Sequence, residues 1–556
     1  MAFLYDEFAA SAPQWYKEIS AAVANDNVAE AEKLAKEQFG KKREVASLLG
    51  MALVYAALGD AYSAKPIIDE AVEMAKGKEK AAALHALARA KAMESDFEGA
   101  KDALAKALEI YEGAQDKLGE ASVMNSRALL SDKSAVDTQA VESNLEMANM
   151  ALEMFKDAKD TNGTASVLDT IVQLKLREGK MSHALSVAEE MLKVYAVAGD
   201  NVGEANAFMR LGDVYRMDDQ LQQALDKTNS ALEIYVQLGE QKKKTIAINR
   251  MAAILSLAGS FPEAQKAANA SLNICRELKD KRGQAATMFL MGNICDEEKE
   301  YSKALFKLEK AVGIYKKLDD KKSEALAMDA IARMQLKAFW SLDEPTEPAL
   351  NSEKALKLLA EIGLDDGAEA AYILNTYAFA LLACERTDDA IEKAKDALNT
   401  FQELADACGE AFTLTTLAQI YWELKDKKEA INLAQKAHKV AEDASELAEV
   451  QWAEKLLEDY GGDKKKNDMA DYFKFTDDSG QSIKSSWIGM YTAASAIGLQ
   501  DYCIVDGFQA RGVVEKKAKA KKASSSSSGF VDEDTGAKKE SRGLKIDLDF
   551  ASLGTA

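Results

Sequence analysis

Hydrophobic and polar residues follow a helical period along most of the chain, and the pattern is clearest in residues 203–240. This stretch, GEANAFMRLGDVYRMDDQLQQALDKTNSALEIYVQLGE, predicts two amphipathic helices joined by a short polar turn and followed by an acidic link that contains glycine. Much the same pattern recurs before and after it at a spacing of forty residues. Because one such hairpin cannot bury its apolar face alone, we expect the hairpins to stack on one another.

A small residue near the start of each second helix gives the register of the hairpins, since the facing helix approaches most closely there. These residues are Ala31, Ala64, Ala100, Asn144, Ala184, Ala224, Ala264, Ala304, Ala355, Ala390 and Ala430. Two long intervals between them predict insertions in the turns, around residues 133–139 and 339–352. We therefore predict about eleven hairpins, with a solenoid over residues 31–460 and an initial pair of helices in residues 1–30.

Small and large residues also recur at fixed offsets within the hairpins. Leu211, Gly212, Tyr215, Ala224 and Ala231 have counterparts at the same spacing, namely Met51, Ala52, Tyr55, Ala64 and Ala71, then Met291, Gly292, Cys295, Ala304 and Ala311, then Leu417, Ala418, Tyr421, Ala430 and Ala437. This pattern resembles the tetratricopeptide repeat over roughly residues 15–455. The resemblance implies an all-α, right-handed superhelical solenoid.

The links between hairpins share a second pattern, as in AGDNVGEA (198–205) and LKDKRGQA (278–285). Asp200 and Asp280 are placed to cap the helices that follow them. The forty-residue period and these links resemble a subclass of tetratricopeptide proteins that includes the LGN/Pins scaffolds, kinesin light chains and MalT-like regulators. RMDDQ (216–220) resembles the end of a GoLoco motif, but it falls where a turn is expected and no FFDLL-type segment precedes it.

The repeat pattern ends near Tyr460, and the remaining chain has a different composition. Residues 468–515 are rich in aromatic side chains and predict either a cap on the open end of the solenoid or a small separate module. Residues 516–556 have the composition of a disordered, basic and serine-rich tail. Its Lys516–Lys522 run is either a solvated linker or a nuclear targeting signal, and the short apolar motif 543–554 is a potential strand or recognition peptide that could lie in the groove of the solenoid.

Composition narrows the possible partners. The formal net charge is −21, which argues against nucleic acid and anionic membranes as partners. The acidity either serves solubility or attracts a basic, extended peptide. No pair of the five cysteines has the CxxC spacing, and no apolar run is long enough to span a bilayer. We therefore expect a cytoplasmic protein without a metal or cofactor.

The sequence contains no constellation of catalytic residues. His85, His183 and His438 belong to different hairpins and should lie far apart, and no phosphate-binding GxxxxGK[ST] motif occurs. We therefore do not expect an enzyme.

The concave groove is the remaining candidate site. In tetratricopeptide arrays the first helix of each hairpin lines the groove, and asparagine amides there can both donate to and accept from an extended peptide backbone. The expected groove positions hold Asn125, Asn206, Met209, Asp213, Arg216, Asn249, Asn293, Asn375, Phe379 and Trp422, although asparagine is also simply tolerated at exposed helical positions.

These features predict a scaffold or adaptor that binds a peptide or a protein segment on its concave surface. Two other classes remain open. One is a structural subunit that uses the convex faces and edges within a larger assembly. The other is a regulatory region that senses a small ligand, as the MalT-like resemblance implies.

Overall fold

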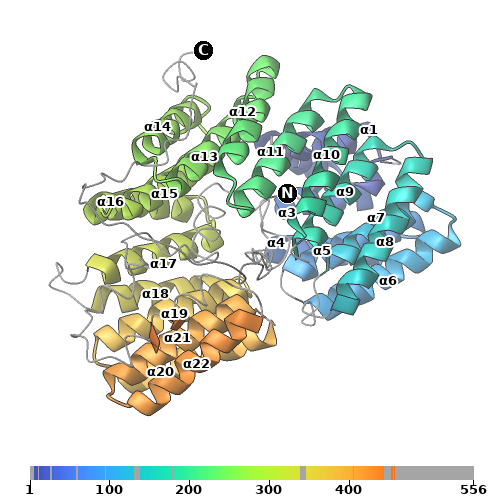
Figure 1. The fold of residues 1–556 in the computed structure, drawn as a ribbon. Helices are drawn as coiled ribbons and strands as arrows, with labels where there is room; N and C mark the ends of the chain where they lie inside the picture. The colour runs from blue at the N-terminus through green and yellow to red at the C-terminus, as the bar shows by residue number, and fades with distance from the viewer. Residues whose placement is uncertain are drawn as a thin grey trace, which may run out of the picture.

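The computed structural model describes residues 6–457, except for residues 11, 25–27, 58–60, 94–95, 131–137, 178–179, 339–345, 405, 444–452 and 455. Within these ranges the regular elements are all helical (Figure 1). They are η1 (Glu7–Ala10), α1 (Gln14–Ala24), α2 (Val28–Lys41), α3 (Val45–Ala57), α4 (Ala61–Met74), α5 (Lys78–Met93), α6 (Phe97–Gly113), α7 (Lys117–Leu129), α8 (Thr138–Asp157), α9 (Thr161–Arg177), α10 (Met181–Ala198), α11 (Asn201–Met217), α12 (Leu221–Leu238), α13 (Gln241–Leu257), α14 (Phe261–Glu277), α15 (Lys281–Glu297), α16 (Tyr301–Lys317), α17 (Lys321–Ala338), α18 (Thr346–Ala360), α19 (Ala368–Ala383), α20 (Thr387–Glu403), α21 (Ala407–Glu423) and α22 (Lys427–Asp443).

Consecutive helices pack as hairpins, from α1 with α2 to α21 with α22, which makes eleven hairpins in the described residues. Each hairpin also packs on the next, and the row of hairpins curves through space (Figure 1). The predicted all-α solenoid of about eleven hairpins is confirmed. Its core is a chain of clusters between successive hairpins, the largest of which runs from Ala205 to Met334.

The small residues that set the register are buried where the helices of a hairpin meet. Ala184, Ala224, Ala264 and Ala304 are fully buried, since a larger side chain would separate the paired helices.

One hairpin has a different register from the predicted one. Helix α18 begins at Thr346, so residues 346–352 are helical rather than part of a turn insertion. At the end of α18 the backbone carbonyl of Leu359 accepts a hydrogen bond from the amide of Leu364, and at the end of α16 the carbonyl of Tyr315 accepts one from the amide of Asp320 in the same way, so Leu359 and Tyr315 are equivalent. Tyr315 follows Ala304 by eleven residues, and the residue eleven positions before Leu359 is Pro348. The counterpart of Ala304 is therefore Pro348 and not Ala355. Proline is tolerated at this position because the amide groups of the first helical turn have no partner within the helix.

The links confirm the predicted caps. Asp200 accepts from the Gly203 amide, and Asp280 accepts from the Gly283 amide, each over 2.9 Å. The glycine is required by packing as well, because a Cβ on Gly203 would lie 2.1 Å from Cδ1 of Tyr195. The RMDDQ stretch forms the turn that was expected, with Asp219 in a left-handed conformation at φ 55°.

The two ends of the described chain add detail to the predicted boundaries. In residues 1–30, where a helix pair was expected, the described part contains η1 and α1, and α1 pairs with α2. Beyond α22, Ala453 and Leu456 are buried against the last core cluster. The expectations for 468–515, for 516–556 with Lys516–Lys522, and for 543–554 lie outside the described residues. Among the described helices, none combines the length and hydropathy needed to cross a membrane.

Candidate partner-binding surface

The first helices of the hairpins form the inner layer of the solenoid. Helices α13 and α15, α17 and α19, and α19 and α21 contact each other across neighbouring hairpins, more extensively than second helices do anywhere in the described residues. In a curved row, the helices that lie closer together are those on the inside of the curve. The face of the first helices is therefore the concave one, and we call it the inner surface.

Three of the predicted groove asparagines join neighbouring hairpins. Nδ2 of Asn125 lies 3.1 Å from Oγ of Ser166, Nδ2 of Asn249 lies 3.0 Å from Oγ1 of Thr287, and Nδ2 of Asn375 lies 2.8 Å from Oγ1 of Thr413. The asparagines are 5%, 3% and 1% exposed, respectively. Their amides thus contribute to the stacking of the first helices.

The other predicted groove residues fall into two groups. Met209 and Phe379 are buried, whereas Asn206, Asp213, Arg216, Asn293 and Trp422 are half-buried. Oδ1 of Asn206 accepts from the Tyr235 hydroxyl over 2.7 Å, and Nζ of Lys427 lies 5.2 Å from the Trp422 ring centre. Because they retain exposed surface, the half-buried residues are the ones that a partner can reach.

Buried ion pairs within this layer were not predicted. Arg210 binds Asp169 in a bidentate manner, with Nε 2.5 Å from Oδ1 and Nη2 2.9 Å from Oδ2, and Arg250 pairs with Asp213. Each pair joins the first helices of two hairpins, α9 with α11 and α11 with α13. The sequence contained a signal for the burial of Asp169, because this residue lies forty residues before Met209 and so occupies the equivalent position on the first helix of an earlier hairpin. Asp169 is fully buried.

A third buried pair lies within α17. Oδ2 of Asp329 accepts from Nε of Arg333 over 2.9 Å, and Asp329 has no exposed surface. Burial raises the pKa of the Asp329 carboxyl above its ordinary value, and the Arg333 charge and the Thr376 hydroxyl counteract part of this effect. Retaining a charge at this depth therefore costs stability.

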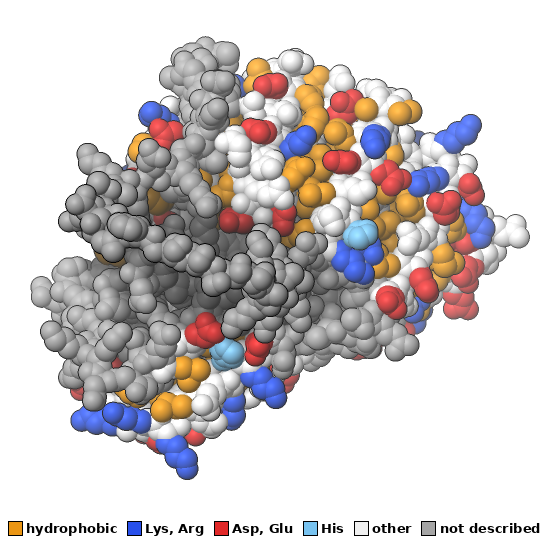
Figure 2. Space-filling view, in the orientation of Figure 1, with side chains coloured by type: hydrophobic (Ala, Val, Ile, Leu, Met, Phe, Trp, Pro, Cys, Tyr) orange, Lys and Arg blue, Asp and Glu red, His pale blue; other side chains and the backbone are white. Residues whose placement is uncertain are grey.

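Charge is spread over the visible outside of the molecule. Figure 2 shows acidic and basic side chains interspersed over the face in view, with hydrophobic side chains between them. Where the described residues form this face, acidic side chains are thus not gathered into one region.

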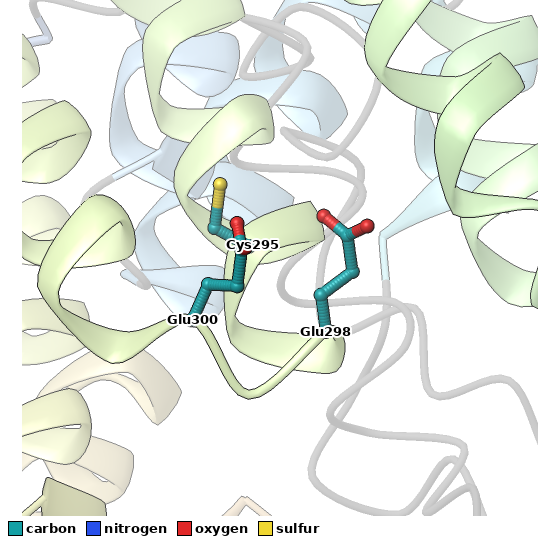
Figure 3. A group of neighbouring side chains, drawn as sticks. All are labelled: Cys295, Glu298 and Glu300. Atoms are coloured by element: carbon teal, nitrogen blue, oxygen red, sulfur yellow. The ribbon is translucent and has the colours of Figure 1, made fainter.

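One thiol and two carboxylates lie close enough to share an ion (Figure 3). Cys295 is on α15, and Glu298 and Glu300 follow in the turn. Burial, with the two carboxylates, raises the pKa of the Cys295 thiol, and the thiolate is the form that binds metals. Glu300 already accepts from Lys303 over 2.7 Å, and Glu298 accepts from Gln265. The arrangement therefore favours a neutral thiol and two carboxylates that are hydrogen-bonded to other side chains.

The histidines do not form a common site. Nε2 of His85 on α5 lies 2.6 Å from Oγ of Ser126, and Nε2 of His438 on α22 lies 3.4 Å from Glu454. His183 is on α10. The three residues thus belong to separate hairpins, as the sequence predicts.

Comparison with known proteins identifies the repeat. The tetratricopeptide repeat family matches residues 244–317 and 369–443. Each match covers a hairpin and its neighbour, α13 to α16 and α19 to α22. No curated protein sequence matches the chain.

Several solved structures are similar to this chain at a low level. Aspartyl phosphate phosphatase F from Bacillus subtilis is 12% identical, with a TM-score of 0.40 over 72% of this chain and 94% of that chain. The APC/C hetero-tetramer Cut9-Hcn1 is 12% identical, with a TM-score of 0.35 over 80% of this chain and 95% of that chain. BtubC from P. vanneervenii is 16% identical, with a TM-score of 0.33 over 46% of this chain and 94% of that chain. Similarities this low do not indicate a function. The family match shows tetratricopeptide repeats in residues 244–317 and 369–443, and the packing of the helices places them within a longer helical solenoid.

Proposed function

We propose that the protein is a scaffold or adaptor that binds a peptide or a protein segment along its inner surface. The observation that supports this proposal most directly is a row of half-buried polar and aromatic side chains on the first helices of the hairpins, of which Asn293 and Trp422 lie in the stretches that match the tetratricopeptide repeat family. Asp213 and Asn293 occupy equivalent positions eighty residues apart, and Arg216 and Trp422 both lie sixteen residues after a capping aspartate. A surface that repeats in this way matches an extended partner, whose groups also recur along its length.

Asn206 illustrates how the surface would hold a peptide. The Tyr235 hydroxyl donates to Oδ1 and so fixes the orientation of the amide. Within the described residues Nδ2 makes no hydrogen bond, and it can therefore donate to a carbonyl of the partner. Arg216 can bind a carboxylate, and the Trp422 face can contact an apolar or a cationic side chain. The net charge of −21 favours partners that carry positive charge elsewhere.

The proposal is tested with two triple variants of the full-length chain. The inner variant carries Asn206→Ala, Arg216→Ala and Asn293→Ala. The control carries Glu233→Ala, Asn273→Ala and Glu309→Ala, at exposed positions of the second helices α12, α14 and α16.

Each protein is used to capture partners from native lysate, and the captured proteins are quantified by mass spectrometry. Three lost contacts of about 1 kcal/mol each correspond to roughly a hundredfold weaker binding, so the inner variant should lose the specific partners that the control retains. Equal recovery by both variants would remove the inner surface as the binding site.

A further inference from the structure

A groove on the outer layer opens between the second helices α14 and α16. Its cavity has a volume of about 430 Å³. Met291 and Cys295 of α15 form the floor, Gln265 of α14 forms one wall, and Phe306 and Lys307 of α16 form the other. This volume is in the range of ordinary ligand sites, which are about 300–1,000 Å³.

The cavity exists because one small side chain replaces larger ones. Cys295 lies forty residues after Leu255 and eighty after Tyr215, which occupy the equivalent position in the two preceding hairpins. The second helices α14 and α16 lie on the outside of the curve and are too far apart to close the gap.

Phe306 is not explained by packing. Phe306 is 54% exposed and lies at the edge of the cavity. The equivalent positions in the three preceding second helices hold Ser186, Asp226 and Lys266, so the hairpin folds with a polar residue at this position. An exposed aromatic ring beside an apolar cavity is typical of a contact site for another apolar group.

The rim of the cavity carries Lys303 and Lys307, and two carboxylates, Glu298 and Glu300, lie beside Cys295 on its floor. Lys310 lies over the Phe306 ring, with Nζ 4.6 Å from the ring centre, whereas Lys303 is paired with Glu300. In the part of the chain that the structure describes, Lys307 forms no ion pair. The site thus suits an apolar side chain that is flanked by carboxylates.

We propose that residues 544–550 of this chain bind in this groove, with Phe550 in the cavity and Asp549 against Lys307. The segment reads LKIDLDF, in which apolar residues alternate with Asp547 and Asp549, and so it complements both the apolar floor and the lysine rim. Residue 544 follows residue 457 by 87 positions, and about 3.3 Å per residue gives a maximal span of roughly 290 Å. Three hairpins separate α16 from the end of α22, a distance that this length readily covers. The segment would then lie on the outer layer and leave the inner surface open.

The test is photo-crosslinking in the full-length chain, with p-benzoylphenylalanine in place of Phe550. Crosslinked peptides are mapped by mass spectrometry. We expect crosslinks within one chain to Met291 or to residues 301–310. The variant Phe306→Asp should lower their yield about tenfold, whereas Met150→Asp should leave it unchanged. Met150 is a matched control because it is 58% exposed and also lies on a second helix, α8.

Exchanging the charges of Lys307 and Asp549 is an independent test. Lys307→Glu should lower the crosslink yield, and the combination of Lys307→Glu with Asp549→Lys should restore it. This second test decides the proposal if Phe306→Asp does not fold, which thermal unfolding followed by circular dichroism would reveal. The proposal would be overturned by crosslinks to the inner surface near Arg216 or by crosslinks between two chains. It would also be overturned if neither Phe306→Asp nor Lys307→Glu changed the crosslink yield.

Discussion

The side-chain amide of Asn249 donates to the hydroxyl of Thr287 over 3.0 Å and thereby joins the first helices of two neighbouring hairpins. Asn375 and Thr413 repeat this contact over 2.8 Å, and the partners are again 38 positions apart in the sequence. In both pairs the threonine hydroxyl also donates to a carbonyl of its own helix, that of Gly283 or of Gly409. The stacking of the repeats therefore depends on specific polar contacts as well as on apolar burial.

Asn249→Ala is expected to loosen this junction. The substitution removes a buried hydrogen bond that contributes about 0.5–1.5 kcal/mol. Because repeat proteins can unfold locally, hydrogen–deuterium exchange is the appropriate measurement, and the amides of α13 and α15 should exchange faster. Asn273→Ala, at an exposed position of α14, serves as the control. Unchanged exchange in α13 and α15 would show that apolar packing alone holds the two hairpins together.

Gly203→Ala is expected to destabilise the protein even though alanine favours helices. The new Cβ would lie 2.1 Å from Tyr195, and crowding of this kind costs about 1–3 kcal/mol, which exceeds the gain in helix propensity of up to about 1 kcal/mol. Gly313→Ala is the matched control on α16, since nothing lies within 4 Å of its added Cβ, and it should be neutral or raise the melting temperature. Thermal unfolding distinguishes the two, and similar shifts in both variants would contradict the packing argument.

The raised pKa of Asp329 predicts how its contribution to stability depends on pH. A carboxyl whose pKa is higher in the folded than in the unfolded chain binds protons more readily when folded. Its unfavourable contribution is therefore full above the folded pKa and is relieved as the pH falls through it. The free energy of unfolding of the natural protein should rise relative to that of Asp329→Asn between pH 7 and pH 4, by up to about 1.4 kcal/mol per unit of pKa difference. Urea unfolding at several pH values measures this gap, and a gap that is constant or moves in the other direction would refute the assignment.

The cysteines should differ in reactivity. Burial and the nearby Asp280 carboxylate raise the pKa of Cys275 to about 12, so at pH 8 only ~1 in 10,000 of these thiols is ionised. Cys384 is less buried than Cys275, and the Arg386 charge counteracts the rise in its pKa. Iodoacetamide labelling followed by peptide mapping should therefore modify Cys384 before the buried Cys275, Cys295 and Cys408. Labelling in urea, where all four should react, controls for reagent access, and equal native rates would contradict this order.

Local features were predicted correctly where the determining residues lie close together in the sequence. Ala224 and Ala264 are buried between paired helices, and Asp200 caps α11, because each effect depends on neighbours within a single hairpin or link. The register assigned to Ala355 was wrong because part of the predicted insertion belongs to α18. Small residues recur at intervals of one or two turns along a helix, so the same pattern also fits a register that is displaced by two turns.

The sequence by itself determined the fold class, the number of hairpins and the caps, since helical periodicity and link composition are properties of short stretches. Only the tertiary structure decided which side chains of the inner layer remain available. Asn249 and Asn206 both carry amides on first helices, yet the first is buried against Thr287 and the second retains a donor. The difference arises because their partners, Thr287 and Tyr235, are 38 and 29 residues away in sequence and are brought into contact only when the hairpins fold and stack.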